Sequence, residues 1–161
     1  MDVRVLAFSA AVRRAGSAWI CADGRCMRPL LLSGDKVRVV PCRKLSRGHL
    51  YCVILPNGQV AVHRLIGTCG NGYLFKGDRS GRFDLLGADR VIGLVDQVAL
   101  RGDKSRVRPL RKPPDTLIVD SALWVFERDG VYLSRRGNAF RYALTVFNLF
   151  VRFGWCLRDL R

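Results

Sequence analysis

Hydrophobic and polar residues alternate with the two-residue period of β-strands between residues 35 and 100. A Pro-Asn-Gly sequence at 56–58 separates two of these apolar runs and is typical of a hairpin turn. Short strands interrupted by Gly and Asn predict a mainly β fold, a coiled antiparallel sheet or partial barrel. The predicted strands cover residues 36–40, 49–55, 59–67, 70–78 and 90–100.

Outside this region the pattern indicates helices and a linker. An apolar stretch at 5–12, within an N-terminal segment 1–23, predicts a short amphipathic helix. Residues 101–115 hold six Lys or Arg, two Asp and three Pro, which is typical of a linker or basic arm rather than a core strand. Helices predicted at 116–128 and 138–157 make residues 116–161 a helical C-terminal extension after the core, 24–100.

The last predicted helix is apolar on almost all sides, and Asn148 and Arg152 are the main interruptions. Such a helix can be buried against the sheet, lie in a membrane interface or dock a partner. A peripheral membrane contact through 139–157 therefore stays open. A membrane-spanning helix is not predicted, because about 18 or more uncharged apolar residues in a row would be needed and the chain has no such run.

The chain has 161 residues, the size of one domain, and a formal net charge of +15. Such a surplus of Lys and Arg predicts attraction to an acidic partner: nucleic acid, an anionic membrane or an acidic peptide. Nucleic acid is the least favoured of these, because aromatic residues are not interleaved with the basic ones.

Six cysteines and two histidines are present, without a Cys-x-x-Cys pair. This spacing predicts neither a metal site nor a cofactor. The flanks of the N-terminal apolar stretch are unlike those of a secretory signal, so we expect reduced thiols and a cytoplasmic protein, with attachment to the inner face of the membrane left open.

Three separate elements carry residues suited to covalent acyl transfer. Cys26 is a candidate nucleophile, His63 a candidate base, and Asp78 or Asp84 a candidate orienting acid. Each residue by itself is weak evidence, because a single His on a strand is usually structural and Gly-Asp is a common turn.

The order of these elements resembles the catalytic core of type I signal peptidases and their LexA-like relatives. The resemblance covers about half of the chain, residues 24 to 100. It rests on the segments "GRCMRP" (24–29), "GD" (34–35), "AVHRLIG" (61–67), "FKGDRSGRFD" (75–84) and "VIGLVDQV" (91–98). The His-Arg pair is similar to the branch of the family that uses His rather than Lys as base.

The resemblance implies a peptidase that cleaves an extended peptide after a small residue. Cys26 stands where the family has Ser, with His63 as general base, Asp84 as the preferred orienting acid and Asp78 as the second choice or a structural residue. Gly24, Met27 and Pro29 would then contact the substrate. A thiol suits an imidazole base, since Cys-His pairs are an established nucleophile arrangement.

The substrate expected from this resemblance is a peptide or precursor protein, such as an acidic leader peptide. Alternatives are a related protein that binds peptides without cleaving them, a serine-peptidase variant carrying Cys26, a DNA-binding protein and a membrane-surface adaptor. DNA binding is disfavoured because about 23 residues precede the Cys26 segment, too few for a helix-turn-helix domain.

Overall fold

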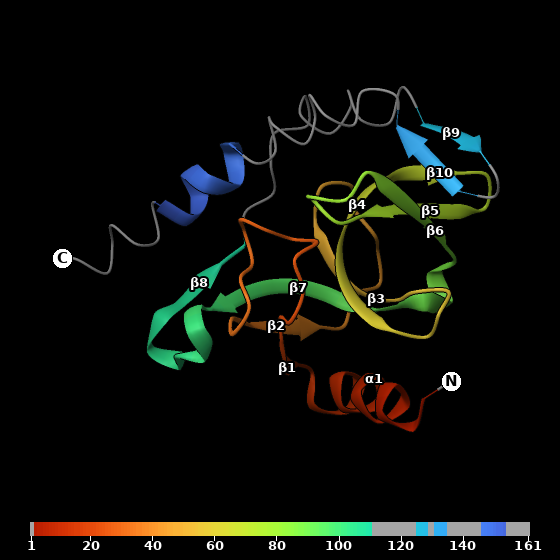
Figure 1. The fold of residues 1–161 in the computed structure, drawn as a ribbon. Coiled ribbons are helices and arrows are strands. Elements are labelled where there is room, and N and C mark those ends of the chain that lie inside the picture. Colours follow the sequence, from red (N-terminus) through yellow and green to blue (C-terminus); the bar gives the residue numbers. More distant parts are fainter. Residues whose placement is uncertain (1, 111–124, 129–130, 135–145, 154–161) are drawn as a thin grey trace.

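The computed structural model describes residues 2–110, 125–128, 131–134 and 146–153 (Figure 1). Ten strands in these residues form one antiparallel sheet, which confirms the predicted mainly β fold. The strands are β1 (Ala18–Cys21), β2 (Lys36–Val40), β3 (Leu50–Ile54), β4 (Val60–Cys69), β5 (Gly72–Lys76), β6 (Arg82–Leu86), β7 (Val91–Ala99), β8 (Val107–Pro109), β9 (Val125–Arg128) and β10 (Val131–Ser134).

The sheet is open and strongly coiled rather than closed. Its order is β1-β2-β7-β3-β4-β5-β6-β10-β9, with β8 also paired to β7. The pairing register shifts where β7 has an extra residue, Asp96 against β2 and Ile92 against β3, and where β4 has one, Ile66, against β5. Such irregularities bend strands and increase their twist. As a result β1, at one end of the sheet, approaches β4 in its middle, and residues from both strands line one cleft.

The hairpin between β3 and β4 forms where the sequence predicts it. Leu55 N–H donates to the carbonyl of Gln59 at 2.8 Å, and Gly58 has a φ of 83°, a conformation that favours glycine. The predictions of strands at β2, β5 and β7 are also confirmed. β1 and β6 were not predicted, because the first is short and the second places Asp84 among apolar residues.

The N-terminal helix α1 (Val3–Ala15) confirms the predicted amphipathic helix. The Asp2 carboxylate accepts a hydrogen bond from Arg4 N–H at 2.9 Å, and the helix ends at Gly16 with a φ of 72°. Val5 and Val12 are buried and join the core cluster of β2, β7 and neighbouring segments. The segment 1–23 thus belongs to the domain, since β1 follows α1 and pairs with β2.

One prediction for the C-terminal part is wrong where the structure describes it. Residues 125–128, expected to be helical, form β9 and pair with β10, because β-branched and aromatic residues in both segments favour strands. The remainder of the predicted helix, 116–124, lies outside the described residues.

Residues 107–109 of the predicted linker form β8 and pair with the end of β7, so this segment contributes a strand. Residues 111–115 lie outside the described part. Helical residues 146–153 confirm the middle of the helix predicted at 138–157, and its two ends are also outside the described residues.

Gly93 sits where two strands approach too closely for a side chain. A Cβ at this position would lie 2.4 Å from the carbonyl oxygen of Val40 and 2.9 Å from a methyl carbon of Val39. Since Gly93 belongs to β7, which pairs with both β2 and β3, a side chain here would push the central strands apart.

We expect Gly93→Ala to lower the free energy of unfolding by roughly 2–3 kcal/mol through this overpacking, as measured by urea denaturation. Gly81→Ala is the matched control, because a Cβ there meets nothing within 4 Å. Equal stability of the two variants would show that the strands tolerate the extra methyl group.

Candidate active site

Cys26 lies in the turn segment between β1 and β2. Backbone hydrogen bonds from Arg28 N–H to the Arg25 carbonyl (3.3 Å) and from Leu31 N–H to the Met27 carbonyl (3.1 Å) shape this segment. Gly24 lies next to the thiol: a Cβ on it would be 3.7 Å from Cys26 Sγ. The side chain of Cys26, the candidate nucleophile, is half-buried in this turn segment.

His63 on β4 faces Asp84 on β6. Its Nδ1 is 2.9 Å from Oδ2 of Asp84, and the side chains of His63 and Asp84 are 9% and 27% exposed. Among the described residues Nδ1 has no other partner, so this ion-pair contact is what orients the ring. The other ring nitrogen, Nε2, points away from Asp84 toward Cys26. This is the orientation that a general base needs to accept a proton from a nucleophile.

Gly77, directly after β5, brings Cys26 and His63 together. A Cβ at Gly77 would lie 2.8 Å from Cβ of Cys26 and 3.3 Å from Nε2 of His63. The same loop is tied to the nucleophile segment by a hydrogen bond from Arg79 N–H to the Cys26 carbonyl at 2.8 Å. The absence of a side chain at Gly77 therefore leaves the room in which thiol and imidazole meet.

The environment favours the protonated imidazole. Burial by itself would lower the pKa of His63, but the Asp84 carboxylate and the Cys26 side chain outweigh it and raise that pKa to about 9. At neutral pH the ring is then an imidazolium. The ring therefore places a positive charge next to the Cys26 side chain.

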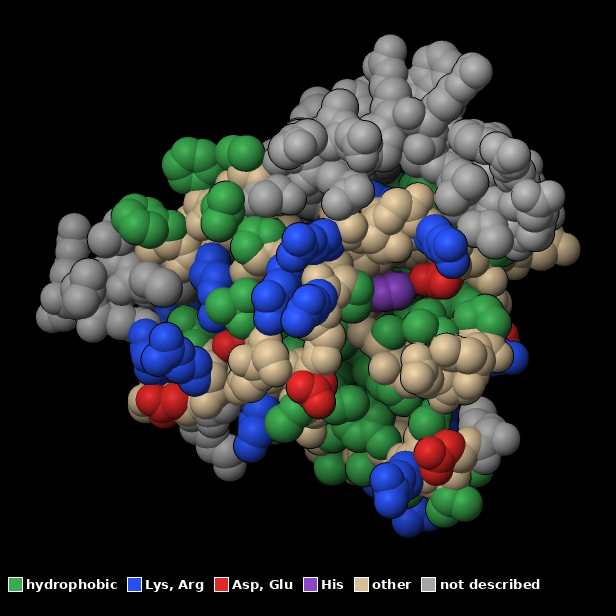
Figure 2. Space-filling model, viewed as in Figure 1, with side chains coloured by type: hydrophobic (Ala, Val, Ile, Leu, Met, Phe, Trp, Pro, Cys, Tyr) green, Lys and Arg blue, Asp and Glu red, His purple; other side chains and the backbone are tan. Residues whose placement is uncertain are grey.

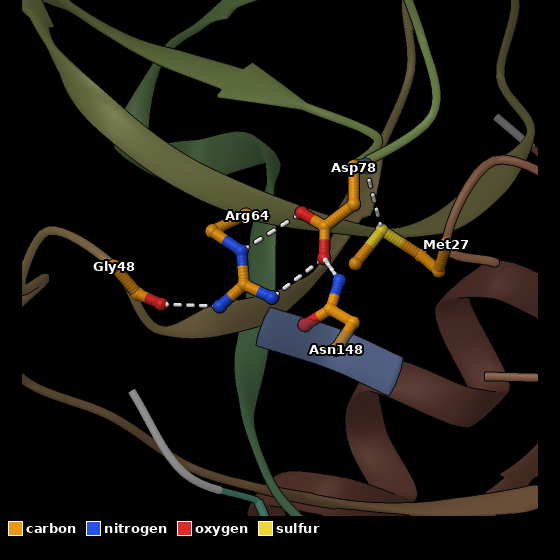
Figure 3. A network of polar contacts seen from close by, with 5 residues as sticks. All are labelled: Met27, Gly48, Arg64, Asp78 and Asn148. Carbon is orange, nitrogen blue, oxygen red and sulfur yellow. Dashed lines mark hydrogen bonds and ion pairs between the residues drawn. The ribbon is translucent and has the colours of Figure 1, made fainter. Parts of the chain in front are cut away.

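Asp78 has a different place from Asp84. Its carboxylate accepts two hydrogen bonds from Arg64, from Nε at 2.8 Å and from Nη2 at 2.6 Å, and a third from Asn148 Nδ2 at 2.7 Å (Figure 3). Arg64 also donates to the Gly48 carbonyl at 2.7 Å, and Asp78 N–H donates to Met27 Sδ at 3.5 Å. Asp78 thus holds its loop, and Asp84 is the acid that contacts His63.

A cleft of about 390 Å³ leads to Cys26 and His63. It separates β1 from the first residues of β4, and each contributes an unpaired backbone edge. In the described sheet β1 pairs with β2 alone, and β5 pairs with β4 from Arg64 onward, beyond the part that lines the cleft. The lining residues are Ile20, Cys21, Ala22, Asp23, Gly24, Cys26, Met27, Leu31, Leu55, Gln59, Val60, Ala61, Val62 and His63.

Of the three predicted substrate-contacting residues, Gly24 and Met27 line this cleft, whereas Pro29 lies in the following turn and does not. Cys21, which is exposed, also lines it. Burial raises the pKa of Cys52 to about 12 and that of Cys42 above its usual value, so these two thiols are disfavoured as thiolates.

Among the described residues, no group of three His, Cys, Asp or Glu side chains is placed so that it could bind a metal ion. None of the helices described here has the length and apolar character to cross a bilayer.

Three residues important to the site were missed by sequence reasoning. Arg64 was visible as a charge within an apolar strand, and a buried charge needs a partner. Asn148 was visible as a polar residue in an apolar helix. Gly77 gave no signal beyond a common Gly-Asp turn, because its role depends on which segments pack above it.

Comparison of the chain with models of known protein families and with curated proteins found no match in either case. The assignment of chemistry to this site therefore depends on the geometry of Cys26, His63 and Asp84.

The raised pKa of His63 predicts a pH-dependent contribution to stability. Because the pKa is higher in the folded protein than the ordinary value of about 6.5, this contribution is complete below that pH and is lost as pH rises through about 9. We expect Asp84→Asn to lower the free energy of unfolding by roughly 1–2 kcal/mol near neutral pH, with the deficit shrinking as pH rises toward 9 and largely absent above about pH 9.

Urea denaturation at several pH values measures this difference. Asp89→Asn, at an exposed position, is the control and should be neutral throughout. A deficit for Asp84→Asn that stays constant through this pH range would contradict the coupling to His63.

Asn148 should contribute to stability although it is a polar residue in a mainly apolar helix. Asn148→Ala removes a donor from the buried Asp78 carboxylate, for an expected loss of roughly 1–3 kcal/mol in urea denaturation. Asn148→Asp should cost more, because it places a second carboxylate beside Asp78. Leu149→Ala, on the exposed face of the same helix, is the control. If the Asn148 variants lose no more stability than Leu149→Ala does, the contact between Asn148 and Asp78 is refuted.

Proposed function

We propose that the protein is an endopeptidase that cleaves a leader or signal-like peptide after a small residue. The observation that carries this proposal is the convergence of Cys26, His63 and Asp84 at a cleft bordered by two unpaired strand edges. Nucleophile, base and orienting acid come from three separate segments, and the resemblance to signal peptidases assigns the same roles to the same residues.

The substrate binds as an extended strand in the cleft between β1 and β4. Backbone N–H and C=O groups along both edges provide hydrogen bonds that any peptide sequence can make, while the cleft walls select side chains. The walls are mainly apolar and include Ile20, Leu31 and Val62. Met27, directly after Cys26, also lines the cleft, and its long side chain beside the thiol supports a small residue before the cleaved bond.

Cleavage proceeds through a thioester. The Cys26 thiolate attacks the carbonyl carbon of the peptide bond, and the resulting oxyanion is stabilised by backbone N–H groups around Cys26. Collapse of this intermediate breaks the C–N bond while the His63 imidazolium gives its proton to the leaving amine. Water then attacks the thioester, His63 takes a proton from that water, and release of the acid restores the Cys26 thiol or its ion pair with His63.

The charge of the chain fits an acidic leader segment, because a net charge of +15 attracts acidic peptides. A cytoplasmic location, at the inner face of the membrane or away from it, is part of the same proposal.

The second candidate is a protein that binds such peptides without cleaving them. It is favoured by Gly24, which stands where some relatives of the signal peptidases carry a serine that helps to hold the oxyanion. Without that hydroxyl, backbone donors alone would have to stabilise the intermediate.

The test is cleavage of a mixed peptide library by the Cys21→Ser protein, which removes the exposed second thiol from the cleft. We expect cuts after small residues, loss of all cutting in Cys26→Ala, and a decrease of at least about 100-fold in His63→Ala. In the same background iodoacetamide should modify Cys26 at neutral pH, and His63→Ala should slow that reaction.

Cutting that survives Cys26→Ala would refute the proposed nucleophile. Retention of library peptides by the Cys21→Ser protein without any cutting would favour the second candidate instead.

A further inference from the structure

The helical residues 146–153 turn their polar side chains toward the protein interior. Asn148 is fully buried and donates to Asp78. Arg152, one turn later, donates from Nη1 to the buried Asp35 carboxylate at 2.7 Å and to the Leu30 carbonyl at 2.8 Å. Two charged or polar anchors, four residues apart, therefore fix which face of this helix points inward.

The opposite face is an apolar stripe. It consists of Val146, Leu149, Phe150 and Phe153, which are 50%, 51%, 73% and 63% exposed and follow the spacing of one helix face. Figure 2, viewed as Figure 1, shows apolar side chains projecting from the surface at the place of this helix, with Lys and Arg side chains beside them.

The fold keeps the apolar stripe exposed to solvent. Rotating the helix to bury the two phenylalanines would separate Arg152 from Asp35 and Asn148 from Asp78, and would leave buried carboxylates without these donors. Such a loss costs several kcal/mol per buried charge, more than the burial of one or two apolar side chains returns. The outward orientation is thus a stable property of the folded protein, and large exposed apolar patches mark interaction sites.

A basic groove adjoins the stripe. It has a volume of about 400 Å³ and is lined by Arg101, Arg106 and Arg152 together with Ser33, Asp35 and two leucines. Arg152 lines the groove and points inward from the helix, so the groove lies beside the inner flank of the helix that carries the apolar stripe. Guanidinium groups of this kind suit phosphate groups.

We propose that this surface, the stripe 146–153 with the Arg101–Arg106 groove, binds the surface of an anionic phospholipid membrane. Phe150 and Phe153 insert at the level of the acyl-chain boundary, and the exposed Arg101 side chain contacts lipid phosphates. The net charge of +15 favours an anionic lipid surface and opposes a second copy of this chain, which would bring an equal positive charge.

This proposal does not depend on peptidase activity, so it can fail or succeed independently of the proposed function. The experiment is flotation of the full chain with vesicles of phosphatidylcholine mixed with phosphatidylglycerol, and with vesicles of phosphatidylcholine alone, in buffer of physiological salt. The key variant is Phe150→Ser with Phe153→Ser. Its matched control is Val3→Ser with Leu6→Ser, which removes two exposed apolar side chains from α1.

We expect binding to the anionic vesicles, weaker binding to phosphatidylcholine alone, and a loss of at least about tenfold in the phenylalanine variant but not in the control. Arg101→Gln should weaken binding about fivefold and make it less sensitive to salt.

The proposal is overturned if the anionic vesicles do not bind the protein or if the phenylalanine variant binds as well as the control. It is also overturned if sedimentation shows a dimer that the phenylalanine variant abolishes, because a second copy then covers the stripe.

Discussion

The buried ion pair between Arg64 and Asp78 is the interaction on which the site depends. Its members are 1% and 2% exposed, and each is the direct neighbour of a residue of the site, His63 on β4 and Gly77 on the loop beside Cys26. Removing one partner of such a pair leaves a buried charge and costs about 3–5 kcal/mol. The pair thus joins the strand that carries His63 to the loop that contacts Cys26.

Two carboxylates on neighbouring segments have separate tasks because their surroundings differ. Asp78 is enclosed, and its oxygens are occupied by Arg64 and Asn148. Asp84 is partly exposed and faces the imidazole ring. Asp78 fixes the position of its loop, and Asp84 stabilises the protonated form of His63. The two carboxylates can therefore lie close together because each has its own cationic or donor partner.

The sequence predicted the sheet best where strands alternate in hydropathy and turns carry glycine, as in β2 and the β3–β4 hairpin. It did not predict β9, because a short run of apolar residues fits a helix or a strand equally well until the partner strand is known. Cys26 and His63 could be proposed from their segments. From the sequence, Asp84 could be preferred to Asp78 as the acid beside His63, but the choice could not be settled. Both residues follow β5, and only the packing of the fold shows that Asp84 contacts the ring. The contact of Asn148 with Asp78 spans 70 residues, and no local pattern encodes such a distance.

The adjacency of His63 and Arg64 on one strand has a consequence for how the chain folds. Successive side chains of a strand point to opposite faces, so a slip of β4 by one residue against β3 would exchange the two. The slipped hairpin could keep its backbone hydrogen bonds, but a guanidinium would then face Cys26, and Asp78 would lose its partner. The ion pair between Arg64 and Asp78 therefore stabilises the native register of β4 relative to the slipped one. Molecules that fold stably are those in which the imidazole already stands beside the thiol.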